Sequence, residues 1–230
     1  MSTSGTYNFA PTLGELTIYA FGLIGIRPTA LLHEHMEGAR MAANLLLGRW
    51  SSMPGVNTWQ VDLQTVDLVP GTATYSVPAN TIAMLDAYVS VSNGVETINR
   101  LILPISRSEY ASYPQPNQQG SVTVFWFDKL LSPTFTLYLV PDGTQASLSY
   151  YRVRQSQDSV LSGGLSVELP VYWLEAFAMG LAARLAMQWK PEMAVALKAA
   201  ADEAYSIAAD QNTETQQFYI SPMVSGYWRA

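Results

Sequence analysis

Residues 167–185 read VELPVYWLEAFAMGLAARL, and this stretch decides how the rest of the chain is organised. Large apolar residues recur after Pro170 at the spacing of one helix face: Trp173, Phe177, Leu181 and Leu185. Pro191 then separates this helix from a final, Ala-rich helix over about residues 192–209. The sequence before Pro170 alternates with period two instead, so a β block ends here and a second helical block begins.

The N-terminal part of the sequence predicts a helical hairpin. Thr12 and Glu15 form a capping box at the start of its first helix, and Gly25 is placed to end that helix. The apolar stripe of the first helix consists of Leu13, Leu16, Ala20, Leu23 and Ile24. A second helix over about residues 29–53 follows Pro28. Its stripe consists of Leu32, Met36, Ala39, Ala43, Leu46, Leu47 and Trp50.

Between the two helical blocks, the apolar pattern has period two and turn residues come at short intervals. The predicted strands cover residues 65–68, 74–77, 83–91, 97–103, 123–127, 134–140 and 146–152. Asn93-Gly94 is the signal of a type I′ hairpin between two of them, and Pro141-Asp142-Gly143 marks another turn.

The order of helices, strands and helices predicts an α+β fold in which the helices pack together across the inserted strands. The helical bundle, formed by the N-terminal and C-terminal helix pairs, would cover residues 12–56 and 168–210. An antiparallel β sandwich or barrel-like module over residues 57–167 is inserted between them. Residues 211–230 contain a proline and a glycine that disfavour a further helix, so we expect an extended C-terminal arm.

The composition is that of a chain with an ample core and a neutral surface. Hydrophobic residues make up 49% of the 230 residues and charged residues 13%, against roughly a quarter charged in an average soluble domain. Such a surface suits permanent protein contacts. The net charge of −6 argues against a stable grip on nucleic acid, which needs clustered Lys and Arg. There is no cysteine for a disulfide or thiolate site, and no apolar run of about 18 residues predicts a membrane span.

No motif identifies an enzyme or a bound cofactor. His33 and Glu37 have the helical spacing of metal ligands, but His35 lies off that face, and an exposed polar face explains the same residues. Acidic residues are scattered singly, so none is marked as the acid or base of a hydrolase. Gly163-Gly164 lacks the lysine and the helix of a phosphate loop. We therefore expect no catalytic residue, no metal and no cofactor.

Three residues of the β block are candidates for contacts with another subunit or another protein. Trp126 lies between Phe125 and Phe127, and because strand neighbours alternate, either Trp126 or the flanking pair faces outward. Arg152 and Arg154 stand beside tyrosines, a combination that can contact nucleic acid. Two arginines are too few for such a patch, so pairing with carboxylates of a neighbouring subunit is the favoured interpretation.

Three stretches carry a resemblance to a known family. They are residues 104–110 (PISRSEY), residues 135–141 (FTLYLVP, followed by a Tyr-rich strand) and residues 167–176 (VELPVYWLEA). In order, spacing and helical flanks they resemble the head-to-tail adaptor proteins of tailed bacteriophages. That family includes head-completion, packaged-DNA-stabilising proteins and tail tubular protein A, and the resemblance covers about residues 12–210.

The resemblance implies a structural virion protein and not an enzyme. Such proteins form a closed ring, typically of twelve subunits, that binds below the portal protein after DNA packaging. The ring extends the DNA channel and provides a platform for a downstream tail or nozzle protein. DNA would pass through the lumen without specific binding, which suits an acidic chain. The protein would be assembled in the host cytoplasm and located in the virion neck, between head and tail, with no membrane partner.

The C-terminal arm is rich in apolar side chains, and the resemblance implies that it reaches the portal protein. The proposed portal-docking residues are Phe218, Tyr219, Ile220, Met223, Val224, Tyr227 and Trp228. Two alternatives keep the arm off the portal: it folds back on its own bundle, or it clasps a neighbouring subunit. For the whole protein, the alternatives are a tail-side neck or terminator ring that does not touch the portal, a cell-wall hydrolase and a carbohydrate-binding module.

Overall fold

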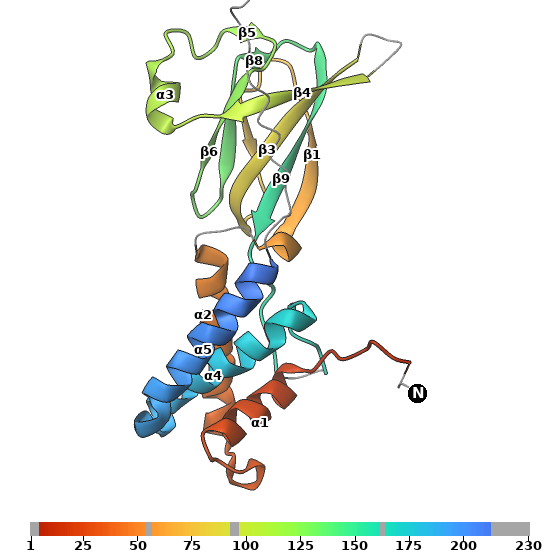
Figure 1. Ribbon diagram of the computed structural model, residues 1–230. Helices are drawn as coiled ribbons and strands as arrows, with labels where there is room; N and C mark the ends of the chain where they lie inside the picture. The colour runs from red at the N-terminus through yellow and green to blue at the C-terminus, as the bar shows by residue number, and fades with distance from the viewer. Residues whose placement is uncertain (1–4, 54–56, 93–96, 162–163, 213–230) are drawn as a thin grey trace, which may run out of the picture.

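The computed structural model describes residues 5–53, 57–92, 97–161 and 164–212. Within these residues, a helical part and a β part are stacked end to end, and each has its own hydrophobic core (Figure 1). The predicted α+β fold is confirmed. The exact domain boundaries stay a prediction, and the expected C-terminal arm lies outside the described residues apart from its first two positions.

Four long helices build the helical part. They are α1 (Leu13–Leu23), α2 (His33–Ser52), α4 (Leu174–Trp189) and α5 (Pro191–Gln211). The capping box at the start of α1 is present: the Glu15 amide donates to Thr12 Oγ1 at 3.2 Å, and the Thr12 amide donates to Glu15 Oε2 at 2.8 Å. The helix α2 begins later than predicted, because Pro28–Ala30 forms a separate 3-10 turn and Leu32 is still extended. A second such turn, Val171–Trp173, leads into α4.

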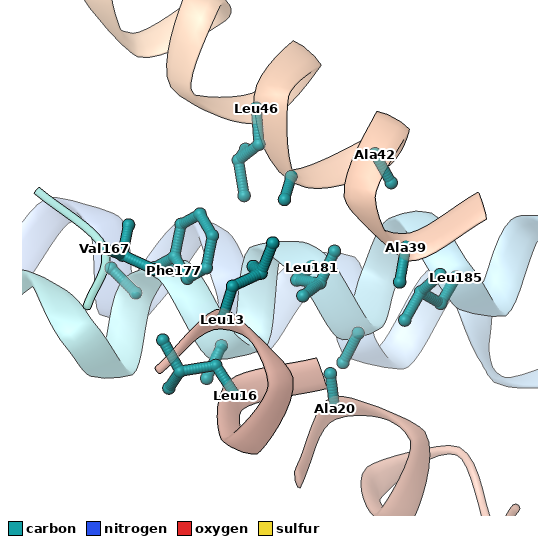
Figure 2. Packing of buried hydrophobic residues seen from close by; sticks show 14 of the residues in the cluster. Leu13, Leu16, Ala20, Ala39, Ala42, Leu46, Val167, Phe177, Leu181 and Leu185 are labelled. Atoms are coloured by element: carbon teal, nitrogen blue, oxygen red, sulfur yellow. The ribbon is translucent and has the colours of Figure 1, made fainter. Parts of the chain in front are cut away.

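The helix α4 lies at the centre of the helical core. Phe177, Leu181 and Leu185 project from it into the space between α1 and α2 (Figure 2). The facing side chains that Figure 2 labels on α1 and α2 are Leu13, Leu16, Ala20, Ala39, Ala42 and Leu46. The C-terminal helices therefore pack on the N-terminal pair, as the stripes predicted. Gly180 makes the close approach of α2 possible, since a Cβ there would lie 2.9 Å from Leu46 Cδ2.

An aromatic cluster fills the end of the helical part that adjoins the β part. The Trp173 ring lies 5.0 Å from those of Trp50 and Trp59 and 5.2 Å from that of Tyr205, measured between centroids. Trp173 is fully buried. Because these four residues come from α2, the chain after it, the start of α4 and α5, the cluster ties both halves of the helical part together.

The β part is one seven-stranded sheet that curls into a half-barrel, in the order β1-β9-β3-β4-β6-β7-β2 (Figure 1). Its strands are β1 (Val61–Asp67), β2 (Thr74–Ser76), β3 (Thr81–Ser92), β4 (Thr97–Pro104), β6 (Val124–Asp128), β7 (Thr134–Tyr138) and β9 (Gln145–Arg154). Each of the seven predicted strands is found. A short parallel pair, β5 (Gln119–Gly120) with β8 (Val140–Pro141), lies beside this sheet.

The β part is not antiparallel throughout, as the prediction had it: besides the short pair of β5 and β8, one pairing within the large sheet is parallel. The strands β4 and β6 pair in parallel, through Leu103 with Val124 and Pro104 with Phe125. A parallel pair needs a crossover, and the segment that contains the short helix α3 (Arg107–Ser112) supplies it. The remaining pairings in the large sheet are antiparallel.

The predicted turn at residues 141–143 is present. Gly143 has φ +95°, and the Thr144 amide donates to Asp142 Oδ1 at 2.9 Å. The strands on either side, β7 and β9, do not pair with each other, because β9 lies between β1 and β3 whereas β7 lies between β6 and β2. The Asn93-Gly94 turn lies outside the described residues, although the strands that flank it, β3 and β4, pair antiparallel as predicted.

Candidate functional site

Two of the predicted contact residues lie together and the third lies apart. Trp126 is on the outer face of the half-barrel, in β6. Arg152 and Arg154 lie at the C-terminal end of β9, where the sheet adjoins the helical part (Figure 1). The proposed portal-docking residues all lie outside the described residues.

The alternation in β6 places Trp126 outward. Phe125 is buried in the β core and Phe127 packs against that core, so the side chain between them projects to the other face. This resolves the two arrangements that the sequence left open. Trp126 is half-buried, because α3 lies over it with the Tyr110 ring 5.6 Å away.

The helix α3 is attached to the sheet by two aromatic contacts. One is Tyr110 on Trp126, and the other is Tyr113 on Tyr138, whose rings stack at 4.1 Å with an interplanar angle of 3°. Ser106 caps the helix, since its Oγ accepts from the Glu109 amide at 3.1 Å. Together they form a small aromatic surface at the outer side of the β part.

Arg152 is held within its own chain. Its Nε donates to Asp62 Oδ1 at 2.7 Å and its Nη2 to Asp62 Oδ2 at 3.0 Å, a bidentate pair. Its Nη1 donates to Asn80 Oδ1 at 2.8 Å and to Thr81 Oγ1 at 2.9 Å. The residue is only 6% exposed. An inter-subunit contact of Arg152 was the expectation, and its observed carboxylate partner is intrachain, because the paired strands β1 and β9 bring Asp62 opposite it.

Arg154 also has a carboxylate partner within the chain. It pairs with Glu168, whose other oxygen accepts from the Gln157 amide at 2.8 Å. Burial acts to raise the pKa of Glu168, but the hydrogen bonds from Arg154 and Gln157 outweigh it and the pKa is lowered. The hydrogen bond to Glu168 raises the pKa of Arg154. This pair connects the end of β9 to the segment before α4.

Hydrogen bonds between uncharged groups also connect the helical part with the β part. We call this network the polar junction. Its members are Asn44, Ser51, Thr58, Gln60, Ser156, Ser159 and Asn212. Gln60 is its centre: it is 1% exposed, and its amide donates to Ser51 Oγ at 2.9 Å and to Ser156 Oγ. Ser159 takes part through its backbone, and its hydroxyl has no partner among the described residues. Buried polar groups that are paired with one another fix a geometry more specifically than apolar contacts do.

One of the two histidines near the start of α2, His35, has a structural role. His35 Nδ1 accepts from the Leu32 amide at 3.1 Å, and its ring lies 4.2 Å from that of Trp189. It thus caps α2 and packs in the helical core. Across the part of the chain that the structure describes, no three His, Cys, Asp or Glu side chains gather as a metal site would require. Over the same residues, no helix is long and apolar enough to cross a membrane.

Among the hollows that open on the described residues of the helical part, two differ in the charges that line them. The first, which we call the acidic groove, has a volume of about 680 Å³ and lies between residues 8–11, α1 and the first turns of α4. Glu15 and Glu175 line it, together with apolar side chains such as Phe9, Tyr19 and Val171, which are all exposed. It is therefore an apolar groove whose charged groups are carboxylates.

The second hollow, which we call the basic pocket, lies between α2, α4 and α5 and has a volume of about 100 Å³. Arg49, Arg184 and Lys198 line it around a floor that includes Trp50 and Tyr205. Partial burial lowers the pKa of Arg184, and the neighbouring charge of Arg49 lowers it further. Asp202 lines the pocket as well, so three cations face one carboxylate, and the net positive charge suits an anionic group.

A family model described as SU10 adaptor protein matches residues 35–226. The chain belongs to this family. The match spans α2, the β part, α4 and α5, so the SU10 adaptor family accounts for both parts of the fold. The resemblance to phage adaptors is confirmed at this level, which makes the chain a structural component of a virion. Among curated proteins, no sequence matches the chain.

In this SU10 adaptor family member, the polar junction and the basic pocket could not be predicted from the sequence, because tertiary structure brings their residues together. The polar junction joins residues as far apart as Thr58 and Asn212, and nothing local marks them. Arg49, Arg184 and Lys198 lie on three different helices. For the basic pocket, the sequence contains one local signal: Arg184 is a charged residue that interrupts the Ala-rich face of α4.

Proposed function

We propose that this SU10 adaptor family member is a head-to-tail adaptor: a ring subunit that binds below the portal protein after DNA packaging, extends the DNA channel and receives the tail. The observation that carries the proposal is the family match over residues 35–226, which includes the helical and β parts together. In this proposal the helical part forms the ring, and the half-barrel with α3 and Trp126 faces the downstream tail protein.

Three physical properties support this role. Charged residues are only 13% of the sequence, and a ring subunit needs a large neutral area for its two neighbours. The net charge of −6 leaves no excess of cations to hold DNA, so a lumen built from this chain would let DNA pass. The polar junction supports a fixed angle between the ring-forming part and the tail-facing part.

Electron microscopy of the purified chain mixed with the portal of its own phage tests the proposal. The expected image is a ring seated on the side of the portal that faces the tail, with the half-barrels pointing away from the head. A chain that stays off the portal and instead caps isolated tails would contradict the adaptor and identify a tail-side terminator ring.

The C-terminal arm is proposed to dock into the portal through the apolar and aromatic residues between Phe218 and Trp228. Deletion of residues 213–230 should then weaken binding to purified portal by at least about tenfold, since an anchoring segment with several aromatic residues carries much of such an interface. The deletion keeps α5, and its melting temperature serves as the folding control. Truncated protein that binds portal as tightly as the full chain would contradict this docking.

A further inference from the structure

The basic pocket gathers three cations that form no ion pair with a carboxylate of the described residues. Three of the 12 basic residues of the sequence line it. Among the described residues, the four ion pairs use other cations, namely Arg40, Arg152, Arg154 and Lys190. Asp202 lines the same pocket but forms no ion pair with Arg49, Arg184 or Lys198. Partly buried like charges repel each other, so an added carboxylate would stabilise the pocket.

The acidic groove offers that carboxylate on a different side of the same helix. Glu175 is exposed and, like Ala178 and Met179, lines the groove, whereas Gly180 and Arg184 line the basic pocket. At 100° per residue, these two sets of α4 positions point in different directions. Glu175 forms no ion pair with another described residue. The helical part thus presents two unlike faces whose charges are complementary.

We propose that the acidic groove of one copy receives the basic pocket side of a second copy, with Glu175 pairing across the contact with Arg184 and its neighbours. A ring is built from heterologous contacts, in which each subunit uses one face for the subunit before it and a different, complementary face for the subunit after it. The inference rests on the proposed ring and deepens it by naming the two faces. Exposed apolar side chains in the groove, such as Phe9 and Val171, would be buried by the same contact.

A second copy accounts for both the acidic groove and the basic pocket, whereas a nucleic-acid phosphate accounts only for the pocket. A phosphate would use the basic pocket alone and leave the exposed apolar groove uncovered. A second copy covers both faces at once and pairs the charges of each.

Charge reversal on the full chain tests the contact. Glu175→Arg puts like charges on the two faces of that variant, and Arg184→Glu does the same with the opposite sign. We expect each variant alone to self-associate at least about tenfold more weakly than the wild type in sedimentation velocity, the size of effect typical of a lost interfacial ion pair. In an equimolar mixture, the reversed groove of one variant meets the reversed pocket of the other, so the mixture should associate as the wild type does.

Two control variants reverse the same charges elsewhere. Arg27→Glu changes an exposed arginine in the loop before α2, and Glu203→Arg changes an exposed glutamate of α5. Both should associate like the wild type. Rescue by mixing also excludes misfolding as the cause of the losses, because a misfolded variant would not recover with a partner.

The proposal is overturned if Arg184→Glu associates normally, if the mixture stays as weak as the single variants, or if the wild type remains monomeric at millimolar concentration. A loss that mixing does not rescue, together with weaker binding of a DNA oligonucleotide, would assign the pocket to phosphate. These outcomes are separate from the adaptor role: if the Arg184→Glu chain still forms a ring on the portal, the adaptor proposal stands and only this contact is wrong.

Discussion

Glu168 is the residue through which the β part holds the segment that leads into α4. Its two carboxylate oxygens accept from Arg154 and from the Gln157 amide, and its side chain is about three-quarters buried, at 25% exposed. The carboxylate of Glu168 has a lowered pKa in the folded chain, so folding favours its charged form. Stability from this group is present above the ordinary value of 4.5 and is lost as the pH falls through the lowered pKa.

We expect Glu168→Gln to lower the free energy of unfolding by about 1 kcal/mol at neutral pH, the upper end for a partly exposed ion pair. The difference between variant and wild type should shrink as the pH falls below 4.5, because the wild-type carboxyl is then protonated as well. Urea unfolding between pH 3 and pH 7 measures the difference in unfolding free energy at neutral pH and its decrease at low pH. Glu203→Gln, at an exposed position of α5, is the matched control and should show no such pH dependence. A constant difference across that range would contradict the role given to Glu168.

Among the elements, α3 depends most on its surroundings. It has six residues, and an isolated helix of that length is not stable in water. Its contacts with the sheet include Tyr110 on Trp126 and Tyr113 on Tyr138. The aromatic surface that we propose for the tail therefore exists only while these rings pack.

Trp126→Ala should release α3 without unfolding the sheet, since Phe125 and Phe127 keep β6 in the core. Amide hydrogen exchange at residues 107–112 should become at least about tenfold faster, whereas exchange in β6 and β7 should change little. Tyr151→Ala removes another half-exposed aromatic side chain from the sheet and should leave α3 protected. Unchanged exchange in α3 would show that Trp126 does not hold it.

The elements also show what the sequence could predict. Period-two alternation predicted the seven strands, and the Thr12–Glu15 capping box predicted the start of α1, because both signals are local. The parallel pairing of β4 with β6 was missed, since register between distant strands depends on tertiary packing. The helix α3 was missed as well, because its stability comes from Trp126 and Tyr138 and not from a repeating stripe.

For the candidate site, the residue types indicated which side chains form contacts, but the sequence did not show which residues they contact. The sequence singled out Trp126, Arg152 and Arg154, but it could not show that β1 places Asp62 opposite Arg152. The basic pocket was missed for the same reason, as Arg49 of α2 lies more than a hundred residues before Arg184 of α4 and Lys198 of α5.

At the scale of the whole molecule, the polar junction sets whether the two parts unfold together. Gln60 is buried and donates to both Ser51 and Ser156, so its removal leaves these two hydroxyls with only the 3.4 Å contact between them. Gln60→Ala should cost about 1–3 kcal/mol and separate one calorimetric transition into two, as the two cores lose their connection. Gln64→Ala, on the neighbouring strand β1, should keep a single transition. A single transition in Gln60→Ala would mean that other contacts couple the parts.

The uncharged groups of the polar junction also determine how the connection between the two parts responds to salt. Hydrogen bonds between uncharged amide and hydroxyl groups are not screened by ions, unlike attraction between exposed charges. The hydrogen bonds of the polar junction should therefore hold the angle between the two parts when the salt concentration changes, whereas the partly exposed Arg154–Glu168 ion pair at the same boundary should weaken as salt rises.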